Sequence, residues 1–260
     1  MEIVRAFAIN KITPVMRTAP ENAELIKYAS NCYLAMKISY INNIAQLCES
    51  VGADVEKIAE GMSYDPRIGS SFLKAGIGYG GSCFPKDTKG LNWIAEGNEV
   101  ELELIKSTIK INESQVEFFL NKLYSRFTNI AKINVSVLGL SFKGGTEDVR
   151  SSQSIPIVKS LLEKGATVQV YDKPGALDNF QQVFSRHSHV KYNLDLESCL
   201  KDADVVLILN DSDEFKCLTA KDFIAHMRKP VIFDGRNLYK FQDMEGTEYH
   251  SIGRMTLMPK

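Results

Sequence analysis

The chain has 260 residues, enough for one large domain or two domains of ordinary size. Its apolar fraction of 44% and its charged fraction of 24% are ordinary for a globular protein. The net charge of −1 gives no overall indication of nucleic acid or membrane lipid as a partner, although local basic residues can still bind phosphates, and no apolar run approaches the roughly 18 residues of a membrane span.

The chain contains five cysteines, an odd number with no CxxC spacing, which argues against a disulfide framework and a structural zinc site. The first residues, MEIVRAFAINKITPVMRT, lack the layout of a signal peptide. We therefore predict a reduced, cytoplasmic protein. Cys83 has an unusual setting, whereas the other cysteines are predicted to be small core residues: Cys32, Cys48, Cys199 and Cys217.

Helical patterns fill the first half of the chain. A helix is expected from Pro20 to about Ser50, with Thr18 and Glu21 as a capping box. At about 30 residues it is longer than most globular helices, and its apolar residues on more than one side indicate burial against both its own domain and a partner. Further helices are expected near Asp54, from Pro85 to Ala95 and from Val100 to Phe127, with a Gly- and Ser-rich loop before Pro85.

Strands alternate with helices after Ala131. Four β-type runs occur, in INVSVLGLSF, ATVQVYD, SCLKDADVVLILN and KPVIFDG, and SQSIPIVKSLLEKG predicts a helix ended by Gly165. This alternation predicts a parallel sheet covered on both faces. The predicted fold is an all-α central domain over residues 20–129, followed by an α/β Rossmann-like domain with a parallel sheet over residues 130–260.

The stretch GYGGSCFPKD places Cys83 between a run of glycines and two charged residues. The glycines would let a backbone or a ligand approach the thiol, and Pro85 marks a helix start beside it. A thiol at a helix N-terminus next to Lys86 is favoured as a thiolate and is nucleophilic, and Asp87 could hold or activate a water molecule. The alternative, a buried cysteine followed by a capping aspartate, is disfavoured by the glycine run.

Lys27 and Asn31 lie four residues apart on the first predicted helix and therefore share a face. An ammonium group and an amide on one face could stabilise a developing oxyanion. An arbitrary pair with this spacing is more often a pair of solvated helix residues, so the spacing leaves both interpretations open.

The stretch GLSFKGGTEDVR follows the first predicted strand, where a parallel sheet is expected to bind a nucleotide, although it is not GxGxxG. Lys143 and Arg150 would contact phosphates or carboxylates, or else be surface charges. Arg236 follows the fourth predicted strand and faces the same edge as Lys143, and two such cations suit a diphosphate. Asp172 is assigned to a turn. The histidines form no cluster and are predicted to be solvated: His187, His189, His226 and His250.

Three stretches resemble one known family. KYASNCYLAMKISYINNIA, DPRIGSSFLKAGIGYGGSCFPKD and GLSFKGGTEDVRSS are similar, in this order, to the central and C-terminal parts of the UDP-glucose 6-dehydrogenases. The resemblance covers nearly the whole chain. The wider family includes enzymes acting on GDP-mannose and UDP-N-acetylmannosamine, but the stretch that ends in GYGGSCFPKD is most similar to the UDP-glucose branch.

The resemblance implies oxidation of a primary alcohol at C6 of UDP-glucose to a carboxylate, with two molecules of NAD. Cys83 would be the nucleophile, adding to the aldehyde as a thiohemiacetal that a second hydride transfer turns into a thioester. Lys27 and Asn31 would stabilise the oxyanions at C6, and Asp87 would assist hydrolysis.

The resemblance also implies binding residues and a partner. The loop residues that would pack on the sugar and the uridine diphosphate are Phe72, Leu73, Lys74, Tyr79 and Gly80. Those that would bind UDP from the C-terminal domain are Phe142, Lys143 and Arg236. Lys86 and Arg150 would reach NAD, Arg67 would reach the neighbouring subunit's site, and the first long helix would form the core of a homodimer.

One departure from the family is large. The family begins with an NAD-binding Rossmann domain, which also carries catalytic Thr and Glu residues, and residues 1–19 here resemble only the end of it. We therefore expect a fragment of a UDP-glucose 6-dehydrogenase, inactive alone. One alternative is a short protein that binds a nucleotide sugar or regulates dimers without catalysis. Another is a different NAD-dependent thiol enzyme with aldehyde-dehydrogenase-like chemistry, which would need its own dinucleotide fingerprint, and we identify none.

Overall fold

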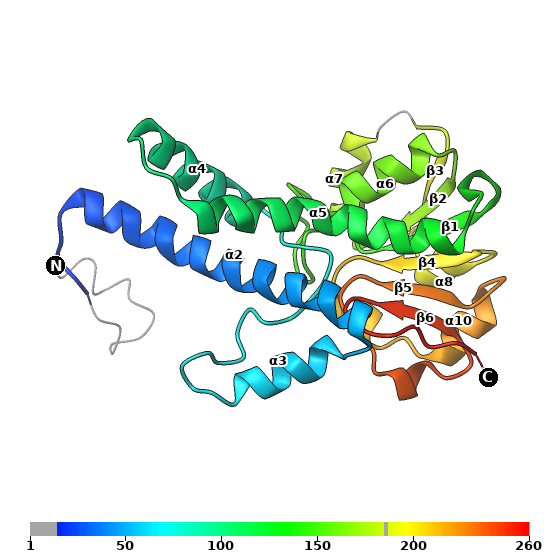
Figure 1. Ribbon diagram of the computed structural model, residues 1–260. Coiled ribbons are helices and arrows are strands. Elements are labelled where there is room, and N and C mark those ends of the chain that lie inside the picture. Colours follow the sequence, from blue (N-terminus) through cyan, green and yellow to red (C-terminus); the bar gives the residue numbers. More distant parts are fainter. Residues whose placement is uncertain (1–14, 185–186, 260) are drawn as a thin grey trace.

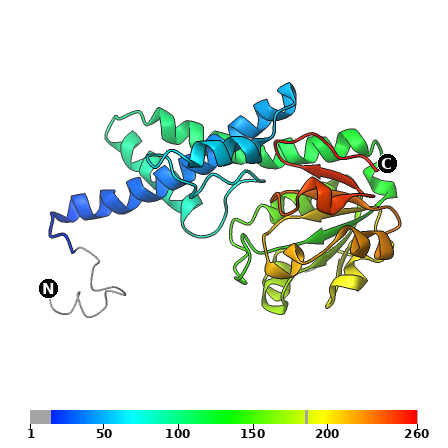
Figure 2. The same cartoon turned by 90° about the horizontal axis from the view of Figure 1, so that it is seen from below.

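A computed structural model of the protein describes residues 15–184 and 187–259. Three long helices, α2 (Pro20–Val51), α4 (Phe84–Gly97) and α5 (Glu103–Arg126), form a helical arm that extends from a sheet-containing part (Figure 1). Helix α3 (Val55–Ser63) follows the inner end of α2, and α2 runs beside α5 (Figure 2). No helix within the described ranges has the length and apolar character needed to cross a bilayer.

The ends of α2 follow from its flanking residues. Pro20 occupies the first turn, and Gly52 ends the helix in the left-handed region (φ 75°), where its N–H donates to the carbonyl of Cys48. The predicted capping box is wrong, because Ala19 is the N-cap residue and the Thr18 hydroxyl accepts a hydrogen bond from the Asn22 side chain (2.9 Å).

The second part contains a six-stranded parallel sheet in the order β3-β2-β1-β4-β5-β6. This is the strand order of a doubly wound nucleotide-binding fold, so the predicted Rossmann-like class is confirmed. The sequence predicted four of the strands, β1 (Asn134–Leu138), β2 (Thr167–Tyr171), β4 (Val205–Ile208) and β5 (Val231–Asp234). It missed the two edge strands, β3 (Val190–Tyr192) and β6 (Glu248–Ser251).

Strand side chains alternate between the two faces of the sheet, and each face has its own hydrophobic cluster. One cluster joins Val135 and Leu207 to α6 (Ser154–Glu163) and α7 (Pro174–Val183), and extends into α2 and α5. The other joins Val206 and Ile232 to the remaining helices, α8 (Leu196–Leu200), α9 (Asp213–Lys216) and α10 (Ala220–His226). The arm therefore shares a core with the sheet. The division into residues 1–19, 20–129 and 130–260 stays a prediction, and residues 1–14 lie outside the described ranges.

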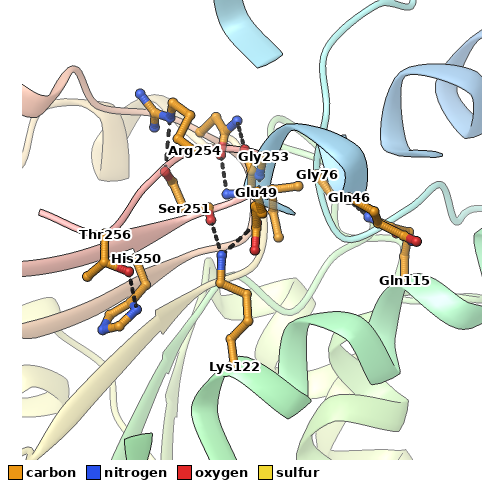
Figure 3. Close-up of polar contacts among 12 residues, drawn as sticks. Gln46, Glu49, Gly76, Gln115, Lys122, His250, Ser251, Gly253, Arg254 and Thr256 are labelled. Atoms are coloured by element: carbon orange, nitrogen blue, oxygen red, sulfur yellow. Dashed lines mark hydrogen bonds and ion pairs between the residues drawn. The ribbon is translucent and has the colours of Figure 1, made fainter. Parts of the chain in front are cut away.

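A partly buried polar joint ties the inner end of the arm to the end of β6 and the segment after it (Figure 3). Lys122 of α5 donates to Glu49 of α2 (2.7 Å) and to the carbonyl of Ser251 (2.5 Å). The backbone N–H of Gly253 donates to the same Glu49 oxygen (2.8 Å). Burial lowers the pKa of Lys122, while the charge of Glu49 opposes that shift. The joint fixes the position of the sheet relative to α2 and α5.

Two predictions of exposure are wrong. His250 lies in β6 and is buried, stacked on Phe233 with 4.1 Å between ring centroids and with its Nε2 2.8 Å from Glu248. Burial lowers the pKa of His250. Cys217, predicted to be a core residue, is exposed after α9, whereas Cys32, Cys48 and Cys199 are buried as predicted.

Candidate active site

Cys83 occupies the N-cap position of α4 and is exposed. Pro85 lies in the first turn of this helix, where its missing N–H costs no hydrogen bond. The Sγ atom lies 3.9 Å from the hydroxyl of Ser82. The thiol is thus placed at the positive end of the α4 dipole, and its role as a nucleophile stays a prediction.

Asp87 connects the start of α4 to α2. Its side chain is 0% exposed, and its Oδ2 atom accepts hydrogen bonds from Lys27 and from Asn31 (2.5 Å). The ammonium group of Lys86 lies 3.5 Å from the other oxygen, Oδ1, which has no hydrogen-bond partner within the described residues. The four residues of the predicted catalytic set are thus brought together: Lys27, Asn31, Cys83 and Asp87.

The charges around Asp87 decide its protonation. Burial acts to raise the pKa of Asp87, but the hydrogen bonds from Lys27 and Asn31 outweigh it and leave that pKa below its ordinary value. Asp87, with a smaller contribution from Cys83, raises the pKa of Lys27. An ionised carboxylate beside a charged ammonium group and a thiol is therefore the expected state at neutral pH.

Replacing Lys27 by methionine should change how stability depends on pH. The folded-state pKa of Asp87 is lowered, so its ionised form stabilises the fold above roughly pH 4, and this contribution is lost as pH falls through the folded pKa. Lys27→Met removes the principal cause of the lowering. The thermal unfolding midpoint should fall at pH 7 and decline less steeply towards pH 2.5 than in the wild type. Lys57→Met, which breaks the exposed Lys57–Glu60 pair, is the control, and identical pH profiles for wild type and Lys27→Met would contradict this account.

A cavity of about 310 Å³ lies between the arm and the carboxyl end of the sheet. Seven residues predicted to bind substrate line it: Phe72, Lys74, Tyr79, Gly80, Phe142, Lys143 and Arg236. Leu73 does not, because its side chain is buried in the first hydrophobic cluster. The cavity thus combines an aromatic wall with three cationic side chains, which suits a ligand with a base or sugar and phosphates.

Arg236 is fixed in place by backbone carbonyl groups. Its Nε atom donates to the carbonyl of Leu209 (2.8 Å), and its Nη1 atom donates to that of Gly78 (2.9 Å). A longer contact joins Nη2 to the carbonyl of Phe142 (3.4 Å). Arg236 follows β5, so one side chain links the rim of the sheet to the glycine-rich loop and places a positive charge at the cavity.

The other predicted cations lie outside this cavity. Arg150 forms a two-point ion pair with Asp148 (2.7 and 2.9 Å) and lines a separate, open hollow of about 890 Å³. The side chain of Lys86 is 69% exposed beside Asp87. Arg67 is exposed, pairs with Asp65 (2.6 Å) and does not line the cavity.

The glycines before Cys83 allow neighbouring atoms to pack closely against the backbone. A Cβ atom at Gly80 would lie 2.3 Å from the carbonyl oxygen of Ser151, and one at Gly81, whose φ is 81°, would lie 2.8 Å from the ring of Phe142. The letters GIGYGG (76–81) match GxGxxG, but no strand precedes them, so this is not the dinucleotide-binding turn of a Rossmann unit.

Several residues at the cavity were missed by sequence reasoning. Phe84, Asp211 and Ile38 line it, and Phe72 adopts a left-handed backbone conformation (φ 64°), which is unusual for an aromatic residue. Four buried or partly buried amides hold the backbone of its glycine-rich wall: Asn42, Asn112, Gln115 and Gln153. Phe84 directly precedes Pro85, the predicted helix start, and this position could have indicated that Phe84 lies near the site. The four amides have no comparable signal in the sequence.

Within the described residues, no group of His, Cys, Asp and Glu is arranged to hold a metal ion.

A doubly wound sheet with a cationic cavity at the carboxyl ends of its strands is the arrangement of a nucleotide-binding α/β protein, and Cys83 directly precedes Phe84, which lines that cavity. Residues 21–114 match the central domain of the UDP-glucose/GDP-mannose dehydrogenase family, and residues 136–241 match that family's UDP binding domain. The two matches together cover more than half of the chain. The chain therefore belongs to the UDP-glucose/GDP-mannose dehydrogenase family.

Individual relatives agree with this family. The chain is 44% identical to UDP-glucose 6-dehydrogenase YwqF of Bacillus subtilis over 99% of its own length and 58% of the relative's. A UDP-glucose dehydrogenase from Pyrobaculum islandicum is similar in structure, with a TM-score of 0.86 and 31% identity over 98% of this chain and 56% of that one. A UDP-D-ManNAc dehydrogenase from Pyrococcus horikoshii has a TM-score of 0.81 and 27% identity, over 97% and 56%. The chain thus spans little more than half the length of these relatives.

Proposed function

We propose that this chain supplies the thiol and the UDP-sugar wall of an NAD-dependent UDP-glucose 6-dehydrogenase, and that the whole enzyme oxidises C6 of UDP-glucose to the carboxylate of UDP-glucuronate. The observation that carries the proposal is the cluster at the start of α4, where Lys27 and Asn31 bind Asp87 within one helical turn of Cys83. The cationic cavity beside it supports a nucleotide diphosphate as the binding group.

The reaction needs two oxidations at one carbon. NAD, when bound, accepts one hydride in each of them. The first oxidation gives an aldehyde, and the Cys83 sulfur then forms a bond to C6 as the aldehyde oxygen takes a proton, giving a thiohemiacetal. Loss of the second hydride leaves a thioester, and water breaks its C–S bond, releasing the carboxylate and the free thiol. Because the chemistry requires a reduced Cys83, we place the protein in the cytoplasm.

The neighbours of Cys83 have defined tasks in this scheme. The ammonium group of Lys27 and the amide of Asn31 would stabilise the negative charge that develops on the oxygen at C6. The ionised Asp87 would orient the attacking water or accept its proton through Oδ1, for which the described residues supply no hydrogen-bond donor. Lys86 and Arg150 are two cations beside the site that would bind the phosphates of NAD. They account for the binding of only that part of the cofactor.

Calorimetric titration of the chain with nucleotide sugars tests the substrate. UDP-glucose and UDP should each bind at one site per chain, because the cavity recognises the diphosphate and base. GDP-mannose should bind at least about tenfold more weakly if the site belongs to the UDP-glucose branch. UDP-N-acetylmannosamine is the third nucleotide sugar to be tested, since one structural relative carries that substrate's name. Equal binding of all three would contradict the assignment to UDP-glucose, and binding of none would contradict a nucleotide-sugar site.

A homodimer through α2 is the proposed assembly. Four large side chains at seven-residue spacing are exposed along this helix: Ile26, Tyr33, Tyr40 and Leu47. A heptad stripe on an exposed helix is typical of pairing with a second helix. Arg67, exposed beyond α3, would then be free to reach the partner's site.

The double variant Tyr33→Asp and Tyr40→Asp should be monomeric, because two carboxylates would be buried in the paired helices. Light scattering after size-exclusion chromatography should give twice the chain mass for the wild type and the single chain mass for this variant. Tyr64→Asp changes an exposed tyrosine outside the stripe and should remain dimeric. A monomeric wild type would refute the assembly.

A further inference from the structure

The segment Lys74–Gly81, which we call the cavity loop, forms one wall of the substrate cavity and leads directly to Cys83. It contains four glycines and lies in no helix or strand. Glycine loses more backbone freedom on ordering than any other residue, so a run of this composition is not rigid by itself. Its fixed shape must come from contacts with other elements.

Most of these contacts come from amide side chains that lie outside the cavity. The N–H of Gly76 donates to the Asn42 side chain (2.8 Å), and its carbonyl accepts from Gln115 (2.8 Å). Asn112 accepts from the N–H of Tyr79 (2.8 Å) and donates to the carbonyl of the same residue (3.2 Å). Gly76 and Tyr79 are therefore each held through both of their backbone groups.

Helix α5 supplies two of these amides. Asn112 and Gln115 are three residues apart, so they project from one face of α5 and meet the loop at Tyr79 and Gly76. They are 6% and 0% exposed and do not line the substrate cavity. Gln115 is itself fixed by Gln46 of α2 (2.8 Å), beside Gly76 in Figure 3. A buried amide that loses its hydrogen-bond partners destabilises the fold, and any other placement of the loop would leave these two amides without partners. The bonds therefore define which loop residue lies against each position of α5.

We propose that Asn112 and Gln115 are positioning residues, which hold the cavity loop so that its aromatic and glycine wall fits a nucleotide sugar and Cys83 meets the bound sugar. The proposal rests on the proposed function for the identity of the ligand. It adds that α5 fixes the shape of the binding surface from outside the cavity, through two amides that contact neither the ligand nor the thiol.

The experiment compares Asn112→Leu and Gln115→Met with Thr108→Val in the full chain. Both substitutions keep the side-chain volume while removing the hydrogen bonds to the loop. Thr108 is buried on the same helix, 2% exposed, and its hydroxyl bonds only within α5, to Leu104 (2.7 Å), so Thr108→Val controls for loss of a buried polar group. All proteins carry Cys217→Ser, which leaves Cys83 as the exposed thiol of the described residues.

Two readouts are taken well below the unfolding temperature of each variant. Affinity for UDP-glucose should fall about tenfold in Asn112→Leu and Gln115→Met but not in Thr108→Val. The rate of alkylation of Cys83 by iodoacetamide, followed by mass spectrometry, should change in the same two variants only, because the loop fixes the backbone before the thiol. A purely structural role would lower the unfolding temperature of all three variants and leave both readouts unchanged.

The outcomes are separable. Wild-type affinity and thiol reactivity in Asn112→Leu or Gln115→Met would overturn the proposal. If Asn112→Leu does not fold, Gln115→Met decides, since it removes one bond to the loop instead of two. If wild-type protein fails to bind UDP-glucose, the proposed function fails, while the alkylation rates still report whether the amides position the loop.

Discussion

Gly80→Ala is expected to destabilise the protein and to remove measurable binding of UDP-glucose. The new Cβ atom would lie 2.3 Å from the carbonyl oxygen of Ser151 and 3.2 Å from Cβ of Phe142, and the first of these is backbone. Because a backbone atom cannot rotate away, the cavity loop itself must move. Overpacking of this kind costs about 1–3 kcal/mol in stability, and the displaced loop would no longer form its wall of the cavity. Thermal unfolding and calorimetric titration with UDP-glucose measure the two effects.

Gly97→Ala is the matched control for this substitution. Gly97 ends α4, has an ordinary backbone conformation, and has no atom within 4 Å of its ideal Cβ position. Alanine there should leave binding unchanged and stability equal or slightly higher, since alanine is the better helix former by about 1 kcal/mol. Retention of full UDP-glucose affinity by Gly80→Ala would show that the loop does not form the binding surface.

Arg236→Met should lower the affinity for UDP-glucose by about 100-fold. The substitution removes a charge at the cavity together with the guanidinium bonds to the carbonyls of Leu209 and Gly78. Hydrogen bonds to charged groups contribute about 1.5–3 kcal/mol each, and about 2.7 kcal/mol corresponds to the expected factor. The cavity loop would also lose its link to the rim of the sheet. The affinity of Arg236→Lys, which keeps the charge but not the planar guanidinium group, should lie between those of the wild type and Arg236→Met.

Arg228→Met provides the control at the opposite end of the same strand. Arg228 precedes β5 and pairs with Asp204 (3.0 Å), far from the cavity rim that Arg236 reaches after the strand ends. Its loss should leave the affinity for UDP-glucose unchanged. Equal weakening by Arg228→Met and Arg236→Met would indicate a general effect of positive charge instead of a built site.

The sequence predicted the architecture because its strongest patterns coincide with buried elements. The apolar runs of β1, β2, β4 and β5 lie inside the sheet; β4 and β5 are buried throughout, and β1 and β2 are buried except at their ends. The edge strand β6, with the sequence EYHS, has no apolar run, yet all four residues are buried because the segment after it and the inner end of the arm cover it. A local sequence pattern does not reveal that elements distant in the chain bury a polar residue. For the same reason the sequence predicts, wrongly, that His250 is solvated.

The site was predictable where chemistry is concentrated in short motifs. Cys83 and Asp87 share a helical turn, and Lys27 and Asn31 share a helix face, so their spacing alone indicated that each pair could act together. Their meeting depends on α2 and α4 packing together, which only the structure shows. Asn112 and Gln115 lie in a helix with many other polar residues, and nothing local marks them as the two that turn inwards onto the cavity loop.

The most direct test of the account is protection of Cys83 by the nucleotide sugar. The rate of alkylation of Cys83 by iodoacetamide is measured in the Cys217→Ser protein, with and without saturating UDP-glucose, and with saturating GDP-mannose as comparison. The account predicts that UDP-glucose slows the reaction at Cys83 at least about tenfold, while GDP-mannose at the same concentration has a much smaller effect. An alkylation rate unchanged by UDP-glucose would contradict the central claim, that the thiol at the start of α4 belongs to a UDP-glucose site.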